Sequence, residues 1–263
     1  QSSPFRTLTR AQRWVRARAP TMSRDITVHL AAGEHPVGAG LVLGAADSGR
    51  NGHTVVYRGA PGGASVISGA MLLSGDWNRS GEVATHAVPC GTKSRQLYRD
   101  DERVPRARSP GEFAVFDGEV QTTATGYVTS DARMAGWKTV QGLEFVYPRT
   151  LANGSEVYKT WTEHRIAVDA VEKVGGKLHV TMRQPAWTRF NATVSGPFVG
   201  GVQPGPGAPV WAEGVSELME SGQWFLDEAG CRVHYRGDSA GAEWRLAVSP
   251  SLMQATEVTD ITL

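Results

Sequence analysis

The chain has 263 residues, which is long enough for one large β domain or two smaller domains with a sizeable core. Its 27 basic and 26 acidic residues nearly cancel, so no overall field favours nucleic acid or an acidic membrane as a partner. No stretch is long and apolar enough to cross a bilayer. No signal-peptide pattern precedes Gln1, but a mature secreted protein would also lack its signal, so export stays open.

Residues 5–19 are predicted to form a helix, which Pro20 ends. Arginines occupy one side of it, and the apolar residues Leu8, Ala11, Val15 and Ala19 recur at helical spacing on the other. A single short amphipathic helix before a run of strands suggests a lid over one end of a β stack.

Short glycine-punctuated strands follow over residues 25–73. The strands that begin at Ile26 and Val55 start 29 residues apart, and those at Leu41 and Val66 start 25 apart. Such spacing suits successive coils of a solenoid, in which each turn returns the chain to the same sheets.

From about Trp77 the strands are longer and alternate in polarity, as in 177–182 and 243–248. Hairpin turns are predicted at Gly175-Gly176 and over 227–230. Residues 197–210 hold four prolines and four glycines, which predicts an irregular loop. We therefore expect an antiparallel sandwich inserted between solenoid coils.

The last residues, 258–263, again have the character of a short apolar strand. We predict that they share a parallel sheet with 66–73. A strand at the end of a stack leaves one hydrogen-bonding edge unsatisfied, so we expect a further segment or a second chain to cover it.

The chain resembles a known family in four short stretches in addition to its opening strands: 95–98 (RQLY), 106–108 (RAR), 184–187 (QPAW) and 222–227 (GQWFLD). The opening (26–33, ITVHLAAG, and 57–69, YRGAPGGASVISG) looks like the start of right-handed parallel β-helix proteins. Together they are similar to bacterial, pectin-lyase-like β-helix glycoside hydrolases related to β-xylosidase and fucosidase families, whose first coils are interrupted by a β-sandwich.

The resemblance implies an all-β chain in three parts: a capping helix and first coils of a right-handed β-helix (1–74), an inserted antiparallel β-sandwich (75–250) and re-entry into the β-helix (251–263). It also implies a secreted, carbohydrate-active enzyme without a cofactor. The catalytic carboxylates of such enzymes lie on later coils, which would be supplied by a C-terminal continuation or a second chain.

One predicted strand carries a candidate sugar-binding surface. Trp161, Glu163 and Arg165 alternate, so their side chains share one face. An aromatic ring can stack on a sugar while a carboxylate and a guanidinium bind its hydroxyl groups. The alternative is a cross-strand Glu–Arg pair beside a packed tryptophan.

Other residues are candidates for the same chemistry. Glu144 and Asp169 join Glu163 as candidate carboxylates, because glycoside hydrolysis uses a pair of them. Trp187 is a further candidate for substrate binding, and Trp137 is similar, although both also suit a hydrophobic core. The arginines between 95 and 108 are interleaved with acidic residues and prolines, which favours a solvated face.

Other chemistries find little support. The seven histidines show no zinc-binding spacing, no Gly-x-Ser-x-Gly elbow occurs, and the glycine-rich stretches lack a phosphate-binding lysine. Cys90 and Cys231 are one possible disulfide pair, and the sequence alone does not decide whether they are bridged. Three functions remain: part of a glycoside hydrolase, a non-catalytic carbohydrate-binding or structural module, and a polysaccharide lyase.

Overall fold

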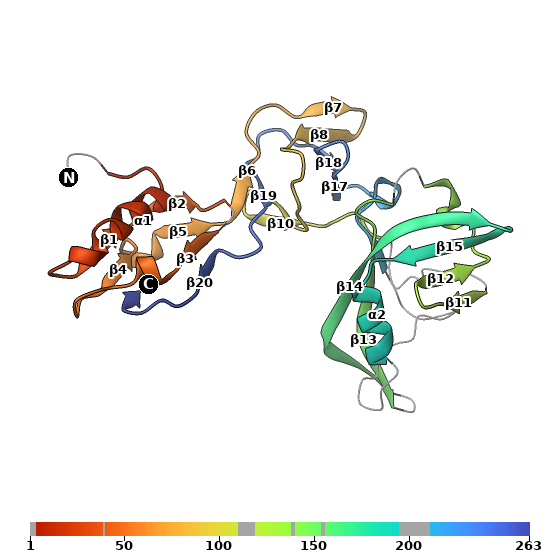
Figure 1. Ribbon diagram of the computed structural model, residues 1–263. Helices are drawn as coiled ribbons and strands as arrows, with labels where there is room; N and C mark the ends of the chain where they lie inside the picture. The colour runs from red at the N-terminus through yellow and green to blue at the C-terminus, as the bar shows by residue number, and fades with distance from the viewer. Residues whose placement is uncertain (1–3, 39, 110–118, 138–139, 154–155, 195–210) are drawn as a thin grey trace. The chain divides into compact units, whose positions relative to one another are not determined.

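The computed structural model describes residues 4–38, 40–109, 119–137, 140–153, 156–194 and 211–263 (Figure 1). The protein is mostly β, and its chain divides into two compact units. The first unit combines residues 1–73 with 243–263, and the second comprises residues 74–242. Within the described residues, no helix has the length and apolar character that crossing a membrane requires.

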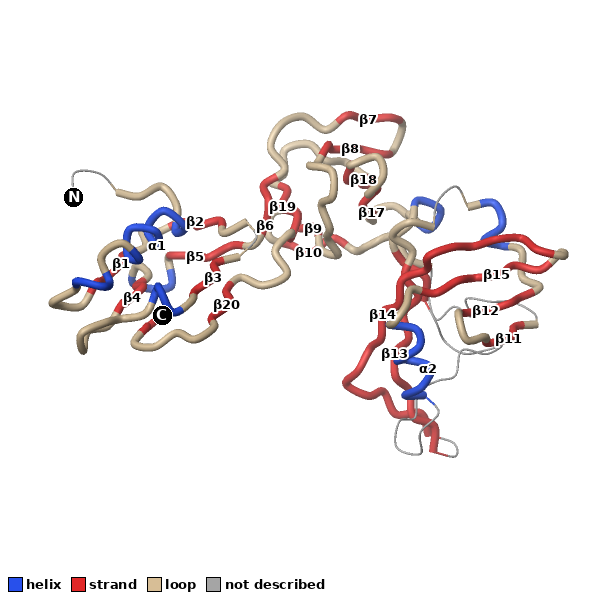
Figure 2. Tube along the Cα trace, in the orientation of Figure 1, coloured by secondary structure: helices blue, strands red, loops and turns tan. Residues whose placement is uncertain are grey.

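The first unit contains three small parallel sheets (Figure 2). The first sheet holds β1 (Ile26–His29), β4 (Val55–Arg58) and β21 (Ile261–Thr262). The second pairs β2 (Gly33–Pro36) with β5 (Ser65–Ser68), and the third pairs β3 (Leu41–Leu43) with β20 (Met253–Ala255).

The chain visits these sheets in a repeating order, first, second, third, first, second, and then third and first again after the insertion. Ile26 lies opposite Val55 in a parallel register, as the 29-residue spacing predicts. The prediction that 66–73 and 258–263 share a sheet is wrong, because β5 pairs with β2 whereas β21 pairs with β4. The chain leaves the three parallel sheets after β5, a strand of the second sheet. When it returns, it first adds β20 to the third sheet and only then adds β21 to the first sheet.

The predicted N-terminal helix is present and shorter than expected. Helix α1 spans Leu8–Arg16 and is followed by the 3-10 turn η1 (Ala19–Thr21). The hydroxyl of Thr7 caps it by accepting a hydrogen bond from the backbone amide of Arg10. The buried face of α1 packs on the sheets in one apolar cluster: Leu8, Val15, Ala19, Met22, Leu30, Val37, Leu41, Leu43, Val55 and Tyr57.

Short elements complete the first unit. They are the 3-10 turns η2 (Ala45–Asp47) and η3 (Pro61–Gly63) and an antiparallel pair of β6 (Ala70–Leu72) with β19 (Trp244–Ala247). This pair lies where the chain leaves for the insertion and returns from it.

The second unit is built on a six-stranded antiparallel sheet with the order β11-β12-β15-β14-β13-β16. Its strands are β11 (Val120–Thr122), β12 (Gly126–Thr129), β13 (Glu144–Asn153), β14 (Glu156–Val174), β15 (Lys177–Met182) and β16 (Trp211–Glu213). The hairpin predicted at Gly175-Gly176 joins β14 to β15. One face of the sheet carries an apolar cluster, which includes Tyr127, Phe145 and Met182.

A four-stranded antiparallel sheet, β17-β18-β8-β7, forms the other part of the second unit. It contains β7 (Asn78–Ser80), β8 (Val83–Ala87), β17 (Trp224–Asp227) and β18 (Arg232–Arg236). The hairpin predicted over 227–230 joins β17 to β18. A further hairpin pairs β9 (Leu97–Arg99) with β10 (Glu102–Val104).

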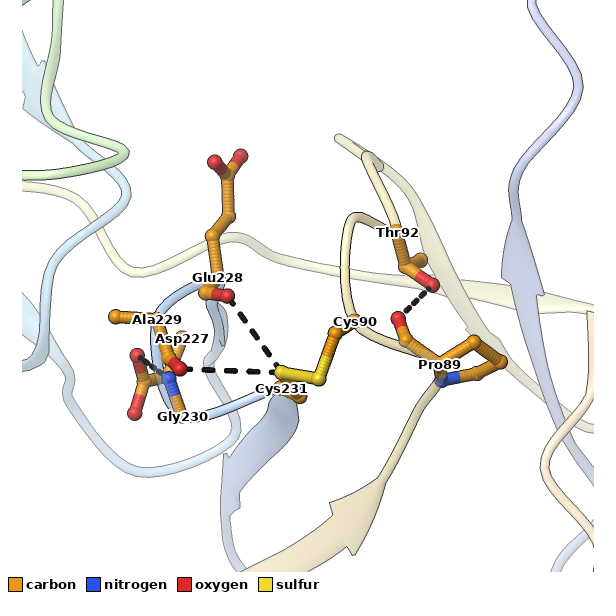
Figure 3. Close-up of a disulfide and its surroundings, with 8 residues drawn as sticks. All are labelled: Pro89, Cys90, Thr92, Asp227, Glu228, Ala229, Gly230 and Cys231. Carbon is orange, nitrogen blue, oxygen red and sulfur yellow. Dashed lines mark hydrogen bonds between the residues drawn. A yellow bond between two sulfur atoms is a disulfide. The ribbon is translucent and has the colours of Figure 1, made fainter.

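A disulfide joins Cys90 to Cys231 across 141 residues of sequence (Figure 3). Cys90 follows β8, and Cys231 lies in the turn between β17 and β18. The backbone amide of Val88 donates to the carbonyl of Cys231, so the two strands already lie side by side where the sulfur atoms meet.

A second helix, α2 (Ala186–Val194), was not predicted from the sequence. Trp187 and Phe190 in its first turns are buried in the cluster on the six-stranded sheet. The segment is short and lacks a sustained apolar period, so tertiary packing rather than propensity decides its conformation. The 3-10 turns η4 (Arg133–Gly136) and η5 (Ser216–Leu218) complete the second unit. The predicted loop at 197–210 lies outside the described residues.

Candidate functional site

The candidate site lies on one face of three neighbouring strands in the second unit, β16, β13 and β14. Directly opposed residues in an antiparallel sheet point to the same side. Glu144 lies opposite Glu213, and Val146 lies between Trp211 and Arg165. The alternate residues Phe145 and Tyr147 are buried in the apolar cluster, so this charged row belongs to the other face.

The sequence-predicted pair on β14 is in contact. The Arg165 guanidinium donates to Glu163 Oε1 through Nε at 2.9 Å and through Nη2 at 2.7 Å. Both side chains reach solvent, with 31% of Arg165 and 45% of Glu163 exposed. The alternating pattern predicts that the two side chains share a face. The alternative was a cross-strand ion pair, whereas the observed ion pair forms within β14. The side chain of Trp161 lies outside the described residues.

A buried carboxylate, Glu144, lies on the adjacent strand and is enclosed by two arginines. Arg95 donates to both of its oxygens, from Nε at 2.9 Å to Oε2 and from Nη2 to Oε1. Arg106 donates from Nη1 to Oε2 at 2.5 Å. Only 6% of the Glu144 side chain is exposed, so these charge-assisted hydrogen bonds replace the water that it loses on folding.

Its cross-strand neighbour Glu213 is equally buried and is also surrounded by arginines. Arg165 donates from Nη1 to Oε2 of Glu213. Nη1 of Arg106 lies 3.9 Å from the same oxygen, and Nε of Arg108 lies 4.0 Å from Oε1. Arg106 therefore lies between the two carboxylates, which separates their negative charges.

The segment that carries Arg106 and Arg108 is held as an added edge beside β16. The Ser109 amide donates to the carbonyl of Ala212, and the Gly214 amide donates to the carbonyl of Ala107. The interpretation of the 95–108 arginines as a solvated face is therefore wrong for Arg106, which is only 11% exposed. This segment reaches the glutamates by pairing with a strand about 100 residues later in the chain. Such a long-range contact cannot be predicted from local sequence spacing.

A close backbone approach makes room for the Arg106 guanidinium. Gly214 has a φ of +96°, and a Cβ there would lie 2.3 Å from the carbonyl oxygen of Gly142 and 2.5 Å from Nη2 of Arg106. Nη2 also donates to that Gly142 carbonyl at 3.3 Å. Any side chain at 214 would thus displace the guanidinium that lies between Glu144 and Glu213.

The electrostatics of the site do not favour acid catalysis by Glu144. Burial alone raises the pKa of its carboxyl, but the hydrogen bonds from Arg95 and Arg106 and their positive charges outweigh burial and hold the pKa below its ordinary value. A general acid for glycoside hydrolysis needs a raised pKa. Glu144 is therefore a carboxylate that orders arginines.

The remaining sequence candidates lie elsewhere in the second unit. The indole of Trp187 is fully buried and donates from Nε1 to the carbonyl of Thr123, so it offers no face to a sugar; the alternative, core packing, describes it. Trp137 packs against the same apolar cluster. Asp169 is exposed and pairs with Arg183 at 2.7 Å, and neither residue forms a hydrogen bond or ion pair with the buried glutamates in the described parts of the chain.

A pair of carboxylates is absent from two cavities of the described residues. One, of about 680 Å³, lies between α1 and β1 in the first unit, and Asp25 is the sole carboxylate among its lining residues. The other, of about 490 Å³, lies against β17 and β18, and there Asp227 has no acidic partner. Neither cavity in the described parts of the chain holds the two acids that glycoside hydrolysis requires.

The second cavity does hold a histidine that burial perturbs. His234 stacks on Phe225 with ring centroids 4.6 Å apart, and its Nε2 lies 3.9 Å from Asp227 Oδ2. Burial lowers the pKa of His234, and the nearby Asp227 only partly offsets this. Across the described ranges, no group of three or more His, Cys, Asp or Glu residues is placed to hold a metal ion.

Trp211, a half-buried residue of the site, was missed from the sequence. The Arg108 guanidinium lies over its ring, 5.0 Å from the centroid. Trp211 directly follows the predicted loop at 197–210, so the spacing of nearby residues did not predict its contact with Arg108.

No family model matches the sequence, and no curated protein matches it either. A solved structure described as a glycoside hydrolase has the same fold, with a TM-score of 0.70 and 20% sequence identity. The match covers 98% of this chain and 46% of that one, so this chain spans about half the length of the matching protein.

Proposed function

We propose that this chain is the N-terminal part of a secreted, carbohydrate-active enzyme, a glycoside hydrolase that acts on a polysaccharide or oligosaccharide. The observation that carries the proposal is the fold shared over 98% of the chain with a protein described as a glycoside hydrolase. At 20% identity the likeness concerns architecture, so the activity itself is our inference.

In this proposal the three parallel sheets are the first coils of a right-handed β-helix. The support is their repeating order, interrupted once between a second-sheet strand and a third-sheet strand. Further coils, from a continuation or a second chain, would pair with the edges of these sheets, as expected from the unsatisfied backbone groups of edge strands.

The catalytic carboxylates would lie on those further coils. Two findings support this placement. Glu144 is held ionised by arginines, and neither cavity of the described residues carries two acids. The inserted unit would then bind the carbohydrate through Glu163 and Arg165, with Trp161 on the same strand as the predicted stacking residue.

The alternative that these findings also favour is a non-catalytic carbohydrate-binding module. The exposed, arginine-paired carboxylate Glu163 suits recognition of hydroxyl groups rather than proton transfer. One measurement distinguishes the two functions. The chain extended with its further coils should hydrolyse glycosides if it is part of an enzyme, and should not if it is a binding module.

The test is to titrate the 263-residue chain with a panel of oligosaccharides by NMR and to assay aryl-glycoside hydrolysis in parallel. We expect no turnover and millimolar binding, because one stacked ring and a few hydrogen bonds contribute little beyond the cost of association. The substitution Glu163→Gln should weaken binding about fivefold, since it removes the charge from one hydrogen-bonding group.

Asp169→Asn is the matched control, because Asp169 is an exposed carboxylate on the same strand that also pairs with an arginine. It should leave binding unchanged. Turnover by the 263-residue chain that collapses in the Glu163→Gln variant would place the acid here and contradict the proposal. Absence of binding to every oligosaccharide would remove the role given to the inserted unit.

A further inference from the structure

The candidate site exposes positive charge and buries negative charge. Each of Glu144 and Glu213 has only 6% of its side chain exposed. Two of the arginines around them reach solvent far more, with 61% of Arg95 and 43% of Arg108 exposed. Glu163 is the one exposed carboxylate in the described part of this group, and Arg165 already neutralises it. A ligand that approaches therefore meets arginine N–H groups first.

Two of these arginines retain unused hydrogen-bond donors. Within the described residues, the Arg108 guanidinium makes no hydrogen bond, and its nearest carboxylate oxygen is 4.0 Å away. Arg95 engages Glu144 through Nε and Nη2, and its Nη1 has no acceptor in the described part of the chain. A guanidinium carries five N–H donors in a planar fork, so both side chains can still bind an anion.

The position of Arg108 is restrained rather than free. Its guanidinium lies over the Trp211 ring at 5.0 Å, and its backbone is paired with Glu213 in the edge beside β16. Because stacking limits the rotamers of a long side chain, less conformational entropy is lost when the donor fork binds a ligand. A restrained guanidinium next to an aromatic ring suits a ligand with both an anionic group and an apolar face.

We propose that this face recognises an anionic sugar, that is, a sugar unit bearing a carboxylate or a sulfate. The anion would bind the exposed forks of Arg108 and Arg95, and the sugar hydroxyls would meet Glu163 and Arg165. The inference rests on the proposed function for the ligand being a sugar, and it adds the charge of that sugar. Buried Glu144 and Glu213 hold the arginines in place without exposing negative charge to the ligand.

The experiment measures binding of three tetrasaccharides to the 263-residue chain by titration calorimetry or NMR at low salt. They are an oligogalacturonate, an uncharged oligogalactose of equal length and a sulfated oligogalactose. We expect at least one anionic ligand to bind about tenfold more tightly than the neutral one, because hydrogen bonds from a guanidinium to an anion are stronger than those to a neutral hydroxyl. The preference should decline as salt is added. Which anionic ligand binds more tightly distinguishes a carboxylate from a sulfate.

Variants assign the effect to the proposed residues. Arg108→Gln should lower affinity for the anionic ligand about tenfold and leave affinity for the neutral one unchanged, and Arg108→Lys should retain part of the preference. Arg183→Gln is the control, since Arg183 is equally charged, 61% exposed and already paired with Asp169. Thermal melting of each variant checks the fold.

The outcomes separate this inference from the proposed function. Equal affinity for the anionic and neutral ligands, or a loss in Arg183→Gln as large as in Arg108→Gln, would overturn the anionic preference while sugar binding stands. No binding of any tetrasaccharide would overturn both. If the preference for the anionic ligand survives in Arg108→Gln, the anionic group binds to other residues, and the site assigned here would be wrong.

Discussion

At the scale of single residues, the site depends on Arg106. Its guanidinium donates to Glu144 and lies within 3.9 Å of Glu213, so one cation serves two buried anions. Buried charges are tolerated when each has a partner, and removal of one partner leaves the others uncompensated. The order of the exposed arginines therefore depends on residues that a ligand does not touch.

Glu144→Gln should lower the free energy of unfolding at neutral pH by about 3 kcal/mol, because it leaves Arg106 largely buried beside a neutral amide. The pH dependence adds a second signature. Since the folded-state pKa of Glu144 lies below the ordinary 4.5, its contribution is fully present above that value and is lost as pH falls through the folded pKa. In Glu144→Gln, the free energy of unfolding should therefore fall less between pH 7 and acidic pH than it does in the wild type.

Urea unfolding of both proteins between pH 3 and pH 7 measures the two effects. Glu163→Gln is the comparison, because that carboxylate is 45% exposed and an exposed ion pair contributes about 1 kcal/mol or less. Equal stability of wild type and Glu144→Gln at pH 7 would contradict the role of the buried carboxylate.

At the scale of elements, α1 is joined to the parallel sheets by a buried carboxylate as well as by apolar packing. Asp47, at the end of η2, is fully buried and accepts hydrogen bonds from Arg16 on α1 at 2.7 and 2.8 Å. It also accepts one from the amide of Gly44 at 2.8 Å. Although burial raises the pKa of Asp47, these hydrogen bonds and the charge of Arg16 lower it on balance.

Asp47→Ala should detach α1 locally before the rest of the chain unfolds. The change leaves the Gly44 amide and Arg16 without this acceptor, and the loss is about 2–3 kcal/mol. Hydrogen exchange is the direct measurement, with faster exchange in α1 and unchanged exchange in β14 and β15. Asp25→Ala serves as the control, because that side chain is 61% exposed. Uniform protection in both variants would show that apolar packing alone holds the helix.

At the scale of the whole molecule, the insertion interrupts a repeating order of sheets without changing it. The chain leaves after β5, forms the second unit and resumes with β20 at the next position of the order. Within the second unit, the disulfide links the segment after the early strand β8 to the late hairpin β17–β18, so it connects the two ends of this unit's chain.

Replacement of both cysteines, Cys90→Ser with Cys231→Ser, should lower the free energy of unfolding by about 2–5 kcal/mol, because a long loop of the unfolded chain is no longer closed. Urea unfolding with and without a reducing agent measures this. Reduction should destabilise the wild type by a similar amount and leave the double variant unaffected. A wild type insensitive to reduction would contradict the contribution of the bridge.

Local features could be predicted from the sequence: the position of the first helix, the 29-residue register of Ile26 on Val55 and two hairpin turns. Each depends on neighbours a few residues apart or on a short repeat, where backbone periodicity and turn chemistry suffice. The three-dimensional packing was needed to show that Glu144 lies opposite Glu213, that Trp187 is buried and that Cys90 bonds Cys231. These contacts join segments far apart in the chain, and their register follows from how whole strands pack, which no local pattern encodes.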